Sequence, residues 1–135
     1  MEKTQQRNLV LILARELAAN SATPMFVVDP EGTLVFFNEP AEHVLGRSFA
    51  ETGPLSPQEW GTVFAPVDAD GKTIPIDHLP LNKALRDLQP GHMGMKITGL
   101  DDEVRMIAVT AFPLFARANE FVGALAIFWE EGPGS

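Results

Sequence analysis

The chain has 135 residues, enough for one domain that buries roughly two-thirds of the surface of its unfolded chain. Its formal net charge of −8 argues against binding to nucleic acid, which requires a basic surface. With no cysteine, it has no disulfides, no thiolate metal site and no thiol catalysis. No apolar run approaches the roughly 20 residues of a membrane span. We therefore expect a cytosolic protein that contacts neither nucleic acid nor membrane.

Residues 1–21 contain no Gly or Pro and are rich in helix-forming residues. Leu9, Ile12, Leu13 and Leu17 recur at the spacing of one helix face. Further apolar residues broaden this stripe beyond what a single packing surface requires. The segment predicts an amphipathic N-terminal helix with more than one apolar contact.

Two apolar runs, Met25–Val28 and Thr33–Phe37, flank the turn sequence Asp29-Pro30-Glu31-Gly32. Pro and Gly occupy the turn positions that their backbone preferences favour, so the segment predicts a β-hairpin. Asn38 then stands at the N-cap of a short helix that Gly46 ends.

Two more helices follow. Ser56-Pro57-Gln58-Glu59 has the pattern of a capping box and predicts a short helix through Trp60 and Phe64. Asp77 is the expected cap of a third helix, which ends before Pro90-Gly91. The acidic turn between these helices lacks the downstream glutamate of a calcium loop.

Three strands complete the chain. Met93–Thr98 alternates apolar and more polar residues, whereas Val104–Leu114 and Phe121–Trp129 are apolar on both faces. Strands of the latter kind are covered on both sides. Two strands, short helices and three strands predict an α+β domain with a five-stranded antiparallel sheet.

This order of elements resembles the PAS domain family over residues 22–130. The resemblance depends on Asp29-Pro30-Glu31-Gly32, Asn38, Leu45-Gly46 and the Pro75–Leu85 segment. It implies the sheet order 2-1-5-4-3, with short helices on one face and the N-terminal helix outside. The expected divisions are a helix over residues 1–21, a PAS domain over 22–131 and a tail over 132–135.

The resemblance implies a sensory or regulatory module of signal transduction that binds without turnover, either free-standing or part of a bacterial signalling protein. Enzymatic motifs are absent from the sequence. Two alternatives remain open: a small-molecule enzyme that uses the same interior cavity, and a haem-binding gas sensor. The effector protein that would receive the signal is unknown.

The resemblance also implies an apolar interior, either a dry core or a pocket for a small apolar ligand. Its expected residues are Phe26, Val28, Leu34, Phe36, Leu45, Met93, Met95, Ile97, Ile107, Val109, Phe121 and Leu125. We expect neither haem nor flavin. The candidate haem ligands, His78 and His92, lie outside a buried helix, and the positions where flavin-binding relatives carry amides are Ile97, Ile107 and Leu125.

Apolar residues in excess of one core predict a homodimer. Its expected interface combines the N-terminal helix with the outer face of the last two strands. The residues named for it are Leu9, Ile12, Leu13, Leu17, Phe112 and Phe128.

Overall fold

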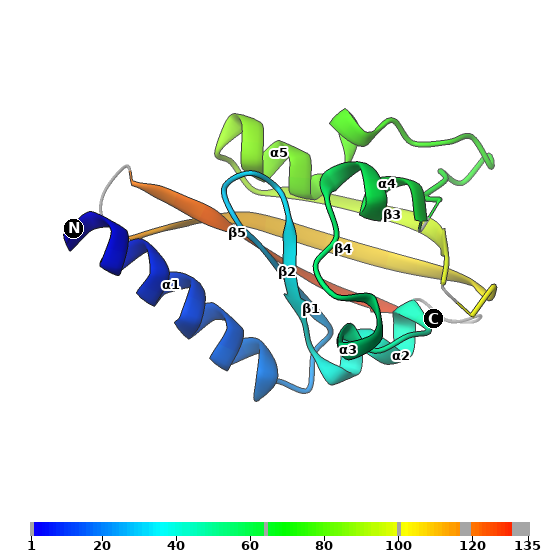
Figure 1. The fold of residues 1–135 in the computed structure, drawn as a ribbon. Coiled ribbons are helices and arrows are strands. Elements are labelled where there is room, and N and C mark those ends of the chain that lie inside the picture. Colours follow the sequence, from blue (N-terminus) through cyan, green and yellow to red (C-terminus); the bar gives the residue numbers. More distant parts are fainter. Residues whose placement is uncertain (1, 64, 100, 117–119, 131–135) are drawn as a thin grey trace.

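The computed structural model describes residues 2–63, 65–99, 101–116 and 120–130 (Figure 1). The expected tail at residues 132–135 and the end of the second predicted helix at Phe64 lie outside these residues. The helices are α1 (Glu2–Ala19), α2 (Glu39–Leu45), α3 (Phe49–Thr52), α4 (Pro57–Val63), a 3₁₀ turn (Ile76–His78) and α5 (Pro80–Asp87). The strands are β1 (Met25–Val28), β2 (Leu34–Phe37), β3 (Gly91–Thr98), β4 (Val104–Phe115) and β5 (Phe121–Glu130).

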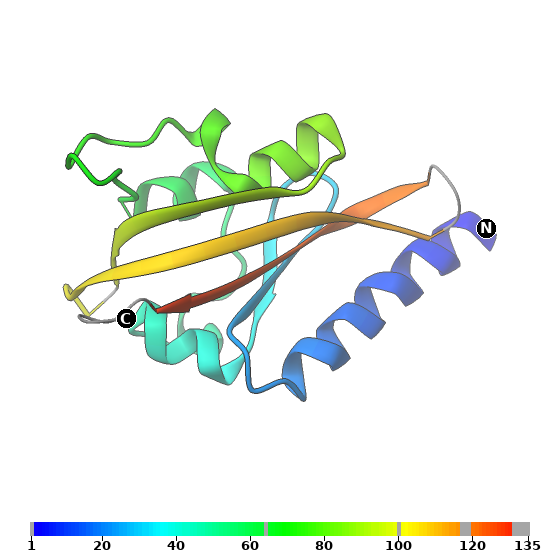
Figure 2. The same ribbon diagram turned by 180° about the vertical axis from the view of Figure 1, so that it is seen from behind.

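The strands form one antiparallel sheet in the order β2-β1-β5-β4-β3, which confirms the expected topology. The short helices α2–α5 lie on one face of this sheet, called here the inner face. Helix α1 lies on the opposite, outer face (Figures 1 and 2). No helix in the described part of the chain is long and apolar enough to cross a membrane.

Two separate apolar clusters stabilise these layers. The larger cluster fills the space between the inner face and α2, α4 and α5, with Phe37 and Phe128 among its most buried side chains. The smaller cluster lies under α1, where Ala14 and Ala18 pack on Met25, Val27 and Leu125.

Asn38 joins three elements at one end of the sheet and is only 1 % exposed. Its Oδ1 accepts hydrogen bonds from the backbone N–H of Ala41, as an N-cap does, and from that of Met25. Its Nδ2 donates to the carbonyl oxygens of Ala18 and Thr23, both at 2.8 Å. This single side chain therefore ties the end of α1 and the start of β1 to α2.

The predicted hairpin turn and helix end have the expected local structure. Asp29 Oδ1 accepts hydrogen bonds from the N–H groups of Glu31 and Thr33, and Gly32 has a φ of 89°. Gly46 ends α2 with a φ of 83°, in the left-handed region that favours glycine.

Two details of the helices differ from the expectations. A short helix, α3, was not anticipated, although Ser48 and Glu51 form a full capping box at its start. Asp77 lies in the 3₁₀ turn, and α5 begins after Leu79 without a side-chain cap. Pro80, in the first turn, has a φ already fixed near the helical value. It also has no backbone N–H, so one fewer N–H group at the start of the helix requires a cap.

Candidate ligand cavity

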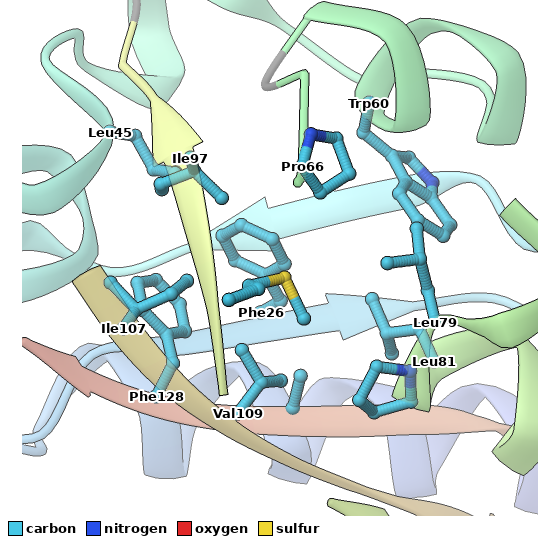
Figure 3. Close-up of a pocket in the computed structure, with 13 residues that line it drawn as sticks. Phe26, Leu45, Trp60, Pro66, Leu79, Leu81, Ile97, Ile107, Val109 and Phe128 are labelled. Carbon is cyan, nitrogen blue, oxygen red and sulfur yellow. The ribbon is translucent and has the colours of Figure 1, made fainter. Parts of the chain in front are cut away.

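A cavity of about 60 Å³ lies between the inner face of the sheet and the α4–α5 region (Figure 3). The strands supply one side of it, and Leu45 of α2 together with the segment from α4 to α5 supplies the other. The 13 lining residues are Phe26, Leu45, Trp60, Pro66, Leu79, Pro80, Leu81, Met95, Ile97, Ile107, Val109, Ala126 and Phe128.

The walls of the cavity are held by specific contacts. The rings of Phe26 and Phe128 meet edge to face, with centroids 4.8 Å apart. Trp60 is 4 % exposed, and its indole Nε1 donates a hydrogen bond of 2.9 Å to the carbonyl oxygen of Gly32. Trp60 is the one lining residue whose side chain has an N–H or O–H group, and the β1–β2 turn accepts its hydrogen bond.

Six of the twelve residues expected to face the interior line this cavity: Phe26, Leu45, Met95, Ile97, Ile107 and Val109. Val28 and Leu34 belong to the same buried cluster without lining the cavity, and Met93 packs against that cluster from a half-buried position. The inward faces of β1, β3 and β4 thus agree with the expectation.

The expected inward position of Phe36 is wrong, because strand β2 contains a bulge. Val27 pairs with Phe36, but the next residue of β1, Val28, pairs with Leu34, which leaves Val35 as an extra residue. The bulge shifts the alternation, so Leu34 and Phe37 point inward. Phe36 packs in the outer cluster, with the guanidinium of Arg15 5.4 Å from its ring centre.

The expected faces of β5 are also wrong. Leu125 lies in the outer cluster under α1, whereas Ala126 and Phe128 line the cavity. Phe128 is therefore unavailable to a dimer interface. Phe121 lies at the start of β5, where its ring contacts that of Phe115 outside the cavity lining. A strand that is apolar on both faces has no alternation from which its register can be predicted.

The other expected interface residues divide between two environments. Phe112 is half-buried beside the cluster under α1, so the chain's own helix covers it. Leu9, Ile12, Leu13 and Leu17 each remain more than 50 % exposed. The dimer itself stays a prediction.

Sequence reasoning missed the residues that close the cavity from the helix side: Trp60, Pro66, Leu79, Pro80 and Leu81. The Leu-Pro-Leu sequence at residues 79–81 was the available signal. It lies within the Pro75–Leu85 segment on which the family resemblance depends, and all three of its residues line the cavity.

Neither candidate haem ligand lines the cavity. His78 is exposed in the 3₁₀ turn. His92 is exposed on β3, where its Nδ1 lies 2.7 Å from the Thr110 hydroxyl. Among the described residues, no group of three or more His, Asp or Glu side chains could hold a metal ion.

Charge is concentrated at the end of the sheet, beyond the cavity. Arg105 makes a two-point contact with the Asp101 carboxylate at 2.8 and 3.0 Å, and its Nε lies 3.6 Å from Glu130. The hydrogen bond from Arg105 is the main reason why the pKa of Asp101 is lowered to about 2. Arg105 pairs across the sheet with Ile97, and Glu130 pairs with Ile107, so this cluster borders two lining residues.

No protein-family model matches the sequence, and no curated protein matches it. Solved structures do match. The PAS domain of Bordetella pertussis BvgS is 18 % identical, with a TM-score of 0.58 over 92 % of this chain and 87 % of that one. The Rhodobacter sphaeroides LOV protein is 15 % identical, with a TM-score of 0.70 over 98 % of this chain and 69 % of that one. The LOV domain of the Erythrobacter litoralis EL346 blue-light-activated histidine kinase is 17 % identical, with a TM-score of 0.62 over 82 % and 97 %.

At these identities the matches show the fold, and the fold is PAS-like. The cavity lies between the inner sheet face and the short helices of that fold. Its walls offer an apolar surface for dispersion contacts, and none of the 13 lining side chains carries a charge.

Proposed function

We propose that this chain is a sensory or regulatory module that binds a small apolar molecule in the cavity and catalyses no reaction. The observation that carries the proposal is the apolar lining of a cavity inside a PAS-like fold. The similarity to a PAS domain of BvgS and to a LOV domain of a histidine kinase supports a role in signalling. The absence of cysteine agrees with a reducing cytosolic location.

The size of the cavity limits the ligand. At about 60 Å³, it is less than half the volume of an engineered cavity of about 150 Å³ that binds benzene or xenon in another protein. We therefore assign a ligand no larger than benzene and without charged groups. Met95 makes the wall adaptable because its unbranched thioether side chain adopts several rotamers.

An enzyme that used the same cavity would require a polar group at the reacting atoms. The lining residues include no carboxylate, imidazole, hydroxyl or ammonium group. The charged cluster at the end of the sheet, Arg105 with Asp101, is engaged in its own ion pair outside the lining. These features favour binding without turnover over the enzymatic alternative.

The lining residues do not fit a flavin or a haem. A buried isoalloxazine ring requires hydrogen-bonding partners, each worth about 1–3 kcal/mol when lost. Of the three positions expected to carry amides, Ile97 and Ile107 line the cavity as apolar residues, and Leu125 faces the other side of the sheet. His78 and His92 lie outside the lining. We expect purified protein to show no flavin or haem absorbance, and a Soret or flavin band would contradict this.

The proposal is tested by thermal unfolding in the presence of xenon, short alkanes or benzene. A ligand at ten times its dissociation constant raises the free energy of unfolding by about 1.4 kcal/mol. In the variant Ala126→Val, added methyl groups occupy the cavity, so the ligand effect should disappear while the protein stays folded. The control variant Thr98→Val, on β3 outside the lining, should keep the full effect. Equal stabilisation of both variants would contradict the proposal.

A further inference from the structure

The two edge strands of the sheet, β2 and β3, differ in how well they are closed to further pairing. Strand β2 has four residues, contains the bulge at Val35, and exchanges two backbone hydrogen bonds with Leu55 through Leu34. Short length, bulges and covering segments are the usual ways in which proteins close a sheet edge. Strand β3, the outermost strand on the other side in Figure 2, has eight residues, no proline and no bulge. Its edge is bridged at one residue only, Lys96, by Val67.

The first half of β3 exposes backbone groups that another strand could pair with. The N–H and the C=O of Lys96 both bond to Val67 at 2.9 Å, so the backbone of Lys96 points toward the edge of the sheet. Because β3 pairs with β4 without a shift in register, the backbone groups of Gly94 and His92 point the same way. Both residues are exposed, and their edge-facing N–H and C=O groups have no hydrogen-bond partner within the described residues. This edge therefore offers two donors and two acceptors at the spacing of an antiparallel ladder.

The local structure leaves room for a second backbone at this edge. Gly94 has no side chain, so its exposed surface is backbone, and glycine in a strand often marks a site where another backbone approaches closely. The bridge from Val67 is antiparallel, so the same edge already accepts main chain in that direction. The chain turns away directly after Val67, because the N–H of Asp68 donates to the carbonyl oxygen of Lys72 instead of to β3. Pairing within the chain therefore stops before it reaches Gly94.

The side chains beside this edge are basic. Although the chain has 18 acidic residues, β3 and β4 contain none of them. His92 and Lys96 lie on the outer face of β3, one on each side of Gly94. Lys83 of α5 is exposed and passes beside Gly91, where an added Cβ would lie 3.3 Å from the Lys83 Cδ. A partner residue opposite Gly94 would have its side chain between His92 and Lys96, which favours an acidic residue there.

We propose that residues 91–95 of β3 bind an extended acidic segment of another protein, which adds to the five-stranded sheet as a further antiparallel strand. Main-chain hydrogen bonds to His92 and Gly94 hold the segment, and an acidic residue opposite Gly94 gives the preference for its sequence. A second copy of β3 is a poorer occupant, because antiparallel pairing centred on Gly94 would place His92 of each chain opposite Lys96 of the other. The inference does not depend on what the cavity binds.

The first test is a titration of the ¹⁵N-labelled full chain with the pentapeptide Val-Glu-Val-Glu-Val, acetylated and amidated at its ends, up to millimolar concentration. The amide signals of His92 and Gly94 should shift in a saturable manner, and their hydrogen exchange should slow, because both N–H groups gain an acceptor. The control peptide Val-Lys-Val-Lys-Val should bind about tenfold more weakly, since its charges repel His92 and Lys96. No saturable shift at His92 and Gly94 would overturn the proposal.

N-methylated peptides separate main-chain pairing from simple charge attraction. In the proposed pairing, the N–H groups of the two glutamates point toward β3 and that of the central valine points away. N-methylation of the glutamates removes the bonds to the carbonyl oxygens of Gly94 and His92 and should weaken binding about tenfold or more. N-methylation of the central valine should leave the affinity unchanged. Equal weakening by the two modifications would show that no strand is added, and the proposal would be wrong.

Variants of the chain test the residues and the occupant. Lys96→Glu should weaken binding of the acidic peptide about tenfold. The matched control is Arg47→Glu, the same change of charge at an exposed residue after α2, which should leave the affinity unchanged. Equal losses would mean that the peptide responds to net charge alone, which contradicts the proposal. Gly94→Pro removes an N–H that the β3–β4 ladder does not use; if light scattering shows a dimer that this variant makes monomeric, a second copy occupies the edge and the proposal is wrong. Circular dichroism of each variant establishes that it is folded.

Discussion

Replacing Asn38 by alanine should destabilise the protein far more than the loss of an ordinary helix cap. The cap to Ala41 alone is worth about 1 kcal/mol. The buried N–H of Met25 would lose its acceptor, at a cost of about 2 kcal/mol. The carbonyl of Thr23 would lose its donor, whereas that of Ala18 keeps the N–H of Ser21, so these two together add about 1 kcal/mol.

The sum is about 4 kcal/mol, a large share of the 5–15 kcal/mol by which domains are usually stable. For a chain of this size it corresponds to a fall in Tm of about 15 °C. Urea unfolding followed by circular dichroism measures the change. The control is Ser48→Ala, which removes an exposed capping box and should cost about 1 kcal/mol. Equal losses for the two variants would refute the argument that Asn38 joins three elements.

The variant Asn38→Asp keeps the acceptor atoms but places a carboxylate beside the Ala18 and Thr23 carbonyl oxygens. Burial and these two oxygens oppose ionisation of the introduced carboxyl and outweigh the N–H groups of Met25 and Ala41 that donate to its Oδ1, so its pKa is raised in the folded state. Relative to wild type, the stability of this variant should therefore fall as the pH rises above about 3.9. A pH-independent difference would contradict the geometry of the Asn38 site.

Two further substitutions test the packing around the end of α2 and the acid sensitivity of the charged cluster. Gly46→Ala should be markedly destabilising, because an added Cβ would lie only 2.5 Å from Asp101 Cγ. The control is Gly53→Ala, because Gly53 also has a positive φ but no atom lies within 4 Å of an added Cβ. In urea unfolding, Gly53→Ala should lower the free energy of unfolding by less than Gly46→Ala does. The pKa of Asp101 is lowered from 3.8 to about 2, mainly by the hydrogen bond from Arg105. The ionised Asp101 carboxylate therefore contributes fully to stability above about pH 4, and this contribution is lost as the pH falls toward 2. Asp101→Asn should flatten the acid limb of a stability–pH curve in this range, and an unchanged curve would show that the ion pair is not formed in solution.

The parts of the fold that depend on local backbone chemistry were predictable from the sequence. Turn residues Asp29 and Gly32, the Asn38 cap and the Gly46 helix end determine the structure of the segments next to them, and the order of elements then favoured the sheet topology. What the sequence did not indicate is that Asn38 also reaches back to α1 and β1, because those contacts join residues up to 20 positions apart.

The faces of β2 and β5 could not be predicted. Alternation along β2 fails at the Val35 bulge, and in β5 nearly every residue is apolar, so a shift by one residue leaves the pattern unchanged. The helix-side wall of the cavity was missed for a different reason. Leu79, Pro80 and Leu81 carry no periodic signal that separates a lining residue from an ordinary core residue.

The central claim, that the inner cavity binds a small apolar molecule, is tested most directly by methyl NMR of the methionines. Met95 lines the cavity, Met25 is buried on the opposite side of the sheet, and Met106 is exposed on the outer face of β4. Titration with xenon should shift the Met95 methyl signal in a saturable manner and leave those of Met25 and Met106 in place. If Met95 does not respond, or if Met25 or Met106 responds equally, the cavity is not the binding site and the account is wrong.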